Sequence, residues 1–258
     1  MSNRIAQAFA NAKAQNRAAF IPFIMGGDPT MEACEKLLFS LPDAGADIVE
    51  LGIPFSDPMA DGPTIQAAGL RALHSGATLE KILILAEKFR TAHPNIPLVL
   101  MGYLNPIYCY GYAQFAEHAA KSGVDGIILV DLPPEEAAEI EPLLSAKNIA
   151  LVRLIAPTSI PDRLPLLTQH AQGYLYLVSI TGITGAGSAT EASIAEYVAQ
   201  IRNVTSLPIA VGFGIKTRAH VEAMGKLADG VVVGSAIVAQ HAESPQETPA
   251  FIRALAGV

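Results

Sequence analysis

An acidic residue stands inside one of the most apolar runs of the chain. Residues 48–52 read Ile-Val-Glu-Leu-Gly, and Glu50 is costly to bury unless it is paired with a base or kept protonated. One interpretation is a structural ion pair with a buried base such as Arg153 in a later apolar run. We favour a general acid or base, because loss of water raises the pKa of a carboxyl group toward neutrality.

A long loop follows this run and carries two further carboxylates, Asp57 and Asp61. Residues 53–66 are punctuated by proline and glycine, and elaborate loops of this kind more often serve function than simple connection. For Asp61 the sequence leaves two roles open, catalysis or capping of a helix that opens near Pro63. Asp57 fits an ordinary turn aspartate. The segment as a whole is therefore a candidate functional loop.

Two glycine-rich segments have the composition of a phosphate site. Residues 211–215 read Val-Gly-Phe-Gly-Ile and residues 233–236 read Val-Gly-Ser-Ala, and each ends an apolar run and leads into a helix. Glycine lets the main chain approach a phosphate closely, and the amides of a helix start point toward it. Neither segment contains arginine or lysine, so binding would use amides and the Ser235 hydroxyl. Tight turns without a ligand are the alternative, and Lys216 is expected in solvent.

Residues 179–188 read Ser-Ile-Thr-Gly-Ile-Thr-Gly-Ala-Gly-Ser, which leaves few large side chains to anchor the segment. Such a composition suits a lid that closes over a substrate, and a plain connector is the alternative. The six histidines show no HxH or HExxH spacing. The sequence therefore predicts no catalytic metal.

Short apolar runs that could position these residues recur along the chain. Nearly all are continuously apolar, as expected of parallel strands buried on both faces. We predict eight strands: Ala19–Met25, Ile48–Leu51, Leu98–Met101, Ile127–Val130, Ala150–Ile155, Tyr174–Val178, Ile209–Val211 and Val231–Val233. Their alternation with helices predicts an α/β fold, a single-domain (β/α)8 TIM barrel over residues 1–258 with an extra N-terminal helix at Ile5–Asn16. An open doubly wound sheet is the alternative, but no GxGxxG follows the first strand.

The segments between the strands carry helix signals. We predict helices at Thr30–Ala44, Thr78–Ala92, Ser193–Val204, Thr217–Leu227 and Pro249–Ala256, with a further helix start at Pro-Pro-Glu-Glu, residues 133–136. Three similar tripeptides each end a helix just before a strand: Gly-Ala-Asp at 45–47, Gly-Val-Asp at 123–125 and Leu-Ala-Asp at 227–229. Their recurrence indicates repeated βα units that are joined in the same way.

The composition narrows the class of protein. Hydrophobic residues make up 51% of the 258 residues and charged residues 16%, which is enough for a large core. A net charge of −7 argues against a nucleic-acid partner but permits a small phosphorylated ligand. Cys34 and Cys109 cannot form a disulfide framework and are predicted to be small buried side chains. The N-terminus does not read as a signal peptide, and every apolar run is far below about 18 residues. We therefore expect a cytoplasmic protein.

Residues 50–63 read Glu-Leu-Gly-Ile-Pro-Phe-Ser-Asp-Pro-Met-Ala-Asp-Gly-Pro, which resembles the signature segment of the tryptophan synthase alpha subunit family. The resemblance continues in Met-Gly-Tyr-Leu-Asn-Pro at 101–106, Gly-Ile-Thr-Gly at 182–185 and Gly-Phe-Gly-Ile at 212–215. With the order of the strands it covers essentially the whole chain. It implies a lyase of tryptophan biosynthesis that splits indole-3-glycerol phosphate into indole and glyceraldehyde 3-phosphate by a retro-aldol step, without a cofactor or metal of its own.

The resemblance also implies roles for particular residues. Glu50 would be the main acid–base residue, and Asp61 would hold the indole N–H. The phosphate contacts would be Gly185, Phe213, Gly214, Gly234 and Ser235, and the substrate pocket would include Phe23, Tyr103, Ile128, Tyr176 and Thr184. Ile180 stands where some relatives carry a basic residue, so a lid contact from that position is not implied.

The family pairs this subunit with a beta subunit that uses pyridoxal phosphate (PLP) and consumes the indole. The resemblance thus implies a heterotetramer of two alpha and two beta chains, activated on assembly, with Asp57 and Pro58 in the docking loop. One alternative is a stand-alone indole-releasing lyase, which would be fully active without a partner. Another is a degenerate barrel that only activates its partner. An indole-glycerol-phosphate synthase would need a lysine at a strand end, and the predicted strands contain none.

Overall fold

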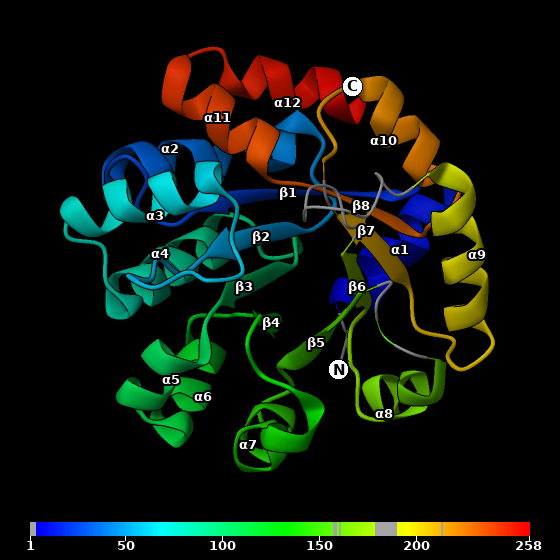
Figure 1. Cartoon of the computed structure of the whole chain (residues 1–258). Coiled ribbons are helices and arrows are strands. Elements are labelled where there is room, and N and C mark those ends of the chain that lie inside the picture. The colour runs from blue at the N-terminus through cyan, green and yellow to red at the C-terminus, as the bar shows by residue number, and fades with distance from the viewer. Residues whose placement is uncertain (1–3, 157–158, 160, 179–189, 213) are drawn as a thin grey trace.

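Eight parallel strands close into one barrel in chain order (Figure 1). The computed structural model describes residues 4–156, 159, 161–178, 190–212 and 214–258. The strands are β1 (Ala19–Met25), β2 (Val49–Gly52), β3 (Leu98–Gly102), β4 (Gly126–Leu129), β5 (Ala150–Ile155), β6 (Leu175–Val178), β7 (Ile209–Gly212) and β8 (Gly230–Val233). β1 pairs with both β2 and β8, which closes the ring. The predicted TIM barrel is confirmed, and each predicted strand lies within one residue of its observed bounds.

Helices surround the strands (Figure 1). They are α1 (Arg4–Ala14), α2 (Met31–Ser40), α3 (Pro63–His74), α4 (Leu79–Ala92), α5 (Leu104–Tyr110), α6 (Tyr112–Lys121), α7 (Glu141–Ala146), α8 (Leu164–Gln169), α9 (Glu191–Arg202), α10 (Arg218–Gly225), α11 (Ser235–Glu243) and α12 (Thr248–Ala256), with short 3-10 helices η1 (Pro42–Ala44), η2 (Pro134–Glu139) and η3 (Pro161–Arg163). Four of the α-helices start at a threonine that accepts an amide hydrogen bond from three residues on: Thr30, Thr78, Thr190 and Thr217. These caps explain why the predicted helix starts are close to the observed ones.

The helix start predicted at residues 133–136 is confirmed, with Glu135 and Glu136 in the first turn, but the helix is of the 3-10 type. Pro133 stays extended, and residues 134–139 form the 3-10 helix η2 instead of an α-helix. A separate short helix, α7, then begins with a proline in its first turn. That proline, Pro142, has no amide hydrogen and is tolerated only at a helix start, so one continuous α-helix cannot run through this segment.

The extra N-terminal helix is confirmed as α1, and it covers the end of the barrel where the strands begin. Its buried side chains include Ile5 and Phe9. Ile5 lies against Gly126 and Gly173, and Phe9 lies against Gly230. These glycines stand at or just before the starts of β4, β6 and β8. A larger residue at these positions would displace the helix, so α1 closes the amino end of the lumen.

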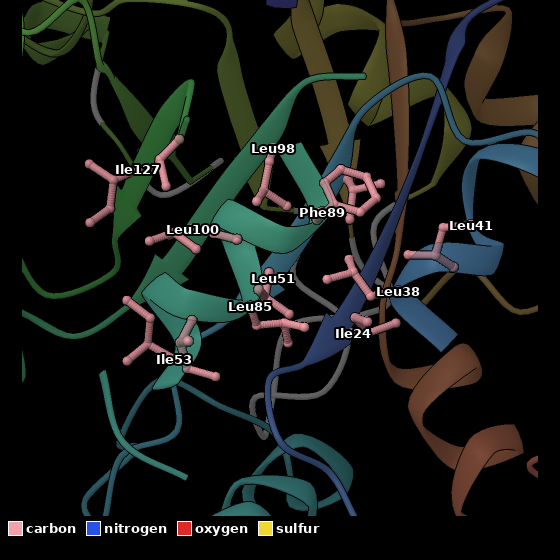
Figure 2. Packing of buried hydrophobic residues seen from close by; sticks show 14 of the residues in the cluster. Ile24, Leu38, Leu41, Leu51, Ile53, Leu85, Phe89, Leu98, Leu100 and Ile127 are labelled. Atoms are coloured by element: carbon pink, nitrogen blue, oxygen red, sulfur yellow. The ribbon is translucent and has the colours of Figure 1, made fainter. Parts of the chain in front are cut away.

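Strand residues alternate between the barrel lumen and the surrounding helix layer. Val49 and Leu51 of β2 belong to the outer core. Figure 2 shows Leu51 in this core with Leu38 and Leu85. Ile48, just before β2, belongs to the lumen cluster. Because successive side chains in a strand point to opposite faces, Glu50 must enter the lumen.

The three recurring aspartates bind neighbouring strands together at their amino ends. In each case one carboxylate accepts the amide of a residue in or beside the preceding strand and also contacts an arginine. The sets are Asp47 with Phe20 and Arg17, Asp125 with Leu98 and Arg90, and Asp229 with Ile209 and Arg202. The repeated tripeptides therefore mark a repeated strand-pairing device, as their spacing predicted.

The two cysteines are free thiols with different surroundings. Cys34 is buried, as predicted, whereas Cys109 is exposed on α5, so the prediction for Cys109 is wrong. The described part of the chain has no helix of the length and apolar character required to cross a bilayer.

Candidate active site

Glu50 is fully buried in the barrel lumen, with 0% of its surface exposed. The Tyr174 hydroxyl donates a hydrogen bond of 2.6 Å to Glu50 Oε1, whereas Glu50 Oε2 has no partner among the described residues. Burial raises the pKa of Glu50 to about 8, and the bond from Tyr174 partly opposes that shift. A carboxyl group with this pKa is largely protonated at neutral pH, so it can donate a proton.

The alternative pairing of Glu50 with Arg153 is wrong. Arg153 follows Val152, a lumen residue, and therefore points outward to the helix layer. There its Nη2 binds Glu141 Oε2 at 2.8 Å. Glu50 thus has no cationic partner on β5, and the tyrosine hydroxyl is its only hydrogen-bond partner within the described chain.

Asp61 lies in the loop between β2 and α3, where the Tyr103 hydroxyl reaches its carboxylate. The same hydroxyl accepts the amide of Ala60 at 3.0 Å. Burial raises the pKa of Asp61 to about 6, and the bond from Tyr103 lowers it in part. The helix-cap alternative is wrong, because the N-cap of α3 is Gly62 and no side chain caps it. Asp61 is therefore free to interact with a ligand.

Glu50 and Asp61 both act on Tyr176 of β6. The pKa of this buried phenol is raised well above its usual value, by burial first and then by the negative charges of the two carboxylates. The ring lies over Gly212 of β7, where a Cβ atom would stand 2.2 Å from the Tyr176 hydroxyl. Both carboxylates therefore lie close enough to Tyr176 for their charges to act on its phenol.

The predicted pocket residues that the structure describes are apolar or aromatic. Phe23, Ile128 and Tyr176 belong to the lumen cluster, and each is almost fully buried. Tyr103 is buried beside Phe55, with ring centroids 5.2 Å apart. Such walls suit a flat aromatic ligand beside the two acids. Thr184, the remaining pocket residue of the prediction, lies outside the described residues.

The carboxyl ends of β7 and β8 lie against two of these side chains, Gly212 against Tyr176 and Gly234 against Phe23. Gly234 caps α11, and Ser235 is its first residue. A Cβ atom on Gly234 would lie 3.4 Å from the Phe23 ring, so this helix start borders the pocket wall. The first helical bond runs from the Val238 amide to the Gly234 carbonyl, so the preceding amides have no partner within the helix. They could bind a phosphate.

The second glycine segment is described in part. Gly214 has a φ of +67°, a left-handed conformation that glycine adopts without strain. Lys216 is exposed, as predicted. Gly185, Phe213 and the predicted lid at 179–188 lie outside the described residues.

The predicted docking loop is exposed on its outer side. Asp57 is exposed and accepts a hydrogen bond from the Ser56 hydroxyl, and Pro58 is half-buried. Met59, next to them, exposes 82% of its surface. The amide of Met59 bonds to the Asp57 carbonyl at 2.9 Å, so Asp57 also forms the local turn that its sequence suggested.

Tyr174 is the site residue that sequence reasoning missed. The sequence analysis places it only at the start of a predicted strand, but it stands two residues before Tyr176 and so points to the same face. The pair of tyrosines at alternate positions was the available signal. Within the described residues, no group of three or more His, Cys, Asp or Glu side chains is placed to hold a metal ion.

A closed parallel barrel that holds two carboxyl groups of raised pKa is typical of a TIM-barrel enzyme. Comparison with known proteins gives the family. The family model for the tryptophan synthase alpha chain matches residues 9–256. This chain therefore belongs to the tryptophan synthase alpha chain family, and the expected resemblance is confirmed. Alpha chains of this family are lyases that cleave indole-3-glycerol phosphate in tryptophan biosynthesis, which assigns this chain the same class of activity.

Individual relatives match most of the chain. A tryptophan synthase alpha chain from Caulobacter sp. (strain K31) is 51% identical over 236 residues, which are 92% of this chain and 86% of the relative. One from Gluconacetobacter diazotrophicus is 48% identical over 242 residues, or 94% and 88% of the two chains. The crystal structure of tryptophan synthase subunit alpha from Legionella pneumophila str. Paris superposes with a TM-score of 0.92 at 37% identity, covering 100% of this chain and 98% of that one.

Proposed function

We propose that Glu50 and Asp61 carry the retro-aldol cleavage of indole-3-glycerol phosphate into indole and D-glyceraldehyde 3-phosphate. The observation that most supports this proposal is the buried Glu50 carboxyl group, whose pKa of about 8 keeps it protonated at neutral pH. Asp61, with a pKa of about 6, is mostly ionised under the same conditions. Two carboxyl groups of different protonation state can serve as acid and anion in one reaction.

The first step is protonation of the indole ring. Protonated Glu50 donates its proton to ring carbon C3, and positive charge spreads to N1. The Asp61 carboxylate accepts a hydrogen bond from the N1–H and stabilises that charge. Glu50 is left as a carboxylate in a lumen that disfavours charge, and it therefore becomes a stronger base.

The second step breaks the carbon–carbon bond. Glu50 takes the proton of the glycerol hydroxyl next to the ring, and that carbon becomes an aldehyde. The electrons of the broken bond return to the ring and neutralise the charge at N1, which releases indole. Glu50 regains its proton, so the cycle is balanced. Each acid–base role is worth about 10²–10⁴ in rate.

The rest of the pocket would bind and orient the substrate. We place the phosphate at the start of α11, on Gly234 and Ser235, and at Gly214, with Gly185 and Phe213 added from the family resemblance. The indole ring would lie among Phe23, Tyr103, Ile128 and Tyr176, with Thr184 from the same resemblance. Anchoring a remote phosphate holds the reacting carbon near Glu50, which converts binding energy into orientation.

We also propose assembly with a beta subunit as two alpha and two beta chains, docked through Asp57 and Pro58. The proposed steps need no cofactor from this chain, and PLP would belong to the beta subunit. The chain would act as one domain over residues 1–258. Its two free cysteines fit a cytoplasmic protein, because thiols stay reduced there. The stand-alone lyase is not favoured, since the relatives are alpha chains of a two-subunit enzyme.

An indole-release assay on the purified chain tests the proposal. Glu50→Gln should lower kcat by about 10²-fold or more while affinity for the substrate stays near that of the native chain. Asp61→Asn should also be severely slow. The exposed Glu87→Gln on α4 is the matched control and should keep full activity. Near-normal turnover of Glu50→Gln would refute the acid–base assignment. The same assay with and without a beta subunit separates the two-subunit enzyme from a stand-alone lyase.

A further inference from the structure

The loop that carries Asp61 is folded into a tight turn. The Asp61 amide donates to the Pro58 carbonyl at 3.1 Å, which closes the turn. On the lumen side, the Tyr103 hydroxyl accepts the Ala60 amide and also reaches the Asp61 carboxylate. These contacts hold the loop from one side only. An exposed loop held from one side can still swing outward.

Gln66 of α3 holds the same turn from the other side. Its Nε2 donates to the Asp61 carbonyl at 2.8 Å and to the Pro58 carbonyl at 3.4 Å. A side-chain amide has two N–H groups, so one Gln66 side chain can serve both carbonyls. The two acceptors are the ends of the turn, so this single side chain bridges it.

Gln66 is presented by a helix that is itself fixed. Arg71 of α3 makes two bonds of 2.7 Å to the buried carboxylate of Asp28, in the loop after β1. The Ser75 hydroxyl, just beyond the helix, donates to the Gly27 carbonyl at 3.1 Å. Bidentate arginine–carboxylate pairs define geometry as well as contributing energy. The helix therefore cannot follow the loop if the loop moves.

We propose that Gln66 is a positioning residue that clamps the 58–61 turn and so holds the Asp61 carboxylate at the pocket beside Tyr103. This inference rests on the proposed function for its kinetic consequence, because only a catalytic Asp61 makes the clamp matter for turnover. The clamp itself is a property of the loop and can be measured without substrate. Gln66 does not touch the substrate and acts through the turn.

The test compares Gln66→Met, which keeps the length of the side chain but has no N–H donor, with Ala67→Met. The control places the same side chain at the next exposed position of α3. Hydrogen exchange should show faster exchange of the Met59 and Asp61 amides in Gln66→Met only. The titration midpoint of the Asp61 carboxyl group, followed by NMR, should fall from about 6 toward its ordinary value, because a released loop exposes the carboxylate to water.

Kinetics complete the test. Gln66→Met should lower kcat by about fivefold to tenfold, the equivalent of about one net hydrogen bond. Its KM should change little, and its melting temperature should equal that of the Ala67→Met control. Unchanged amide exchange and an unchanged Asp61 midpoint would overturn the inference, whatever the activity. If the exchange changes and Asp61→Asn is as active as the native chain, the clamp stands and the proposed role of Asp61 fails.

Discussion

At the scale of single residues, two opposing effects set the pKa of the Glu50 carboxyl group. Burial in the lumen disfavours the charged form and raises its pKa, and the Tyr174 hydroxyl favours the charged form and lowers it. The resulting pKa of about 8 lies near neutral pH, where a group that both donates and accepts a proton works best. Asp61 has the same two influences, from burial and Tyr103, but its pKa is only about 6.

These shifts predict the pH dependence of indole release. Asp61 must be ionised, so the rate should fall as the pH drops below about 6. Glu50 must be protonated, so the rate should fall as the pH rises above about 8. Tyr174→Phe removes the hydrogen bond that lowers the pKa of Glu50, so the alkaline limb should move to higher pH while the acid limb stays. Rate profiles of both proteins measure this, and an alkaline limb that moved downward would contradict it.

At the scale of elements, the glycines after β7 and β8 decide where the main chain can meet a phosphate. Gly234 starts α11 beside the Phe23 ring, and Gly214 takes a left-handed conformation. Residues with a Cβ atom pay about 1–2 kcal/mol for a left-handed conformation. A larger residue at Gly214 would therefore strain or shift the main chain whose amides would point at the phosphate.

Gly214→Val should therefore weaken binding of glycerol phosphate, by about tenfold for each 1.4 kcal/mol of strain or misplaced amide. Isothermal titration calorimetry measures the change. Gly62→Ala is a suitable control, because a Cβ atom there meets no other atom within 4 Å and its φ of −75° is ordinary. Equal affinity of Gly214→Val and the native chain would remove Gly214 from the phosphate site.

The recurring aspartates are a second device at this scale, and they serve stability. Asp125 is nearly buried and bonds to Arg90, Arg4 and the Leu98 amide. Asp229 is more exposed, and both of its contacts to Arg202 are 3.3 Å long. A buried carboxylate with several partners contributes more than an exposed one with long contacts.

Asp125→Ala should accordingly lower the free energy of unfolding by about 2–3 kcal/mol, and Asp229→Ala by about 1 kcal/mol. Urea unfolding followed by circular dichroism gives both values. If Asp229→Ala lost more free energy of unfolding than Asp125→Ala, burial would not decide how much each aspartate contributes to stability.

At the scale of the whole molecule, the barrel separates stability from function by its two ends. α1 and the three aspartates lie where strands begin, whereas the acids, the glycine turns and the exposed loop with Met59 lie where strands end. Met59 exposes 82% of its surface at that end, and exposed apolar side chains favour contact with a protein partner. This arrangement would put the docking surface next to the pocket.

Met59→Lys should then weaken binding to a beta subunit by about tenfold or more, as burial of an unpaired charge in an interface costs over 1 kcal/mol. Ile84→Lys on α4 is the control, since Ile84 is also an exposed apolar residue, at 54%, but lies on the flank of the barrel. Titration calorimetry with a beta subunit compares the two. Equal loss in both variants would argue against docking at this loop.

The sequence by itself determined the strands, most helix starts and the position of Glu50 inside an apolar strand. Those features depend on short-range periodicity and capping, which a window of a few residues contains. Residues 133–136 show the limit of such a window, because they predict the helix start but not its 3-10 type, and Pro142, which prevents one continuous α-helix, lies outside them.

Only the tertiary structure decided what the carboxyl groups contact. Glu50 meets Tyr174 across 124 positions of sequence, and Asp61 meets Tyr103, which follows β3. No local pattern encodes such partners, because they come together only when the barrel closes. Arg153 was the natural candidate partner from charge alone, yet the alternation along β5 sends it to the opposite side of the barrel wall.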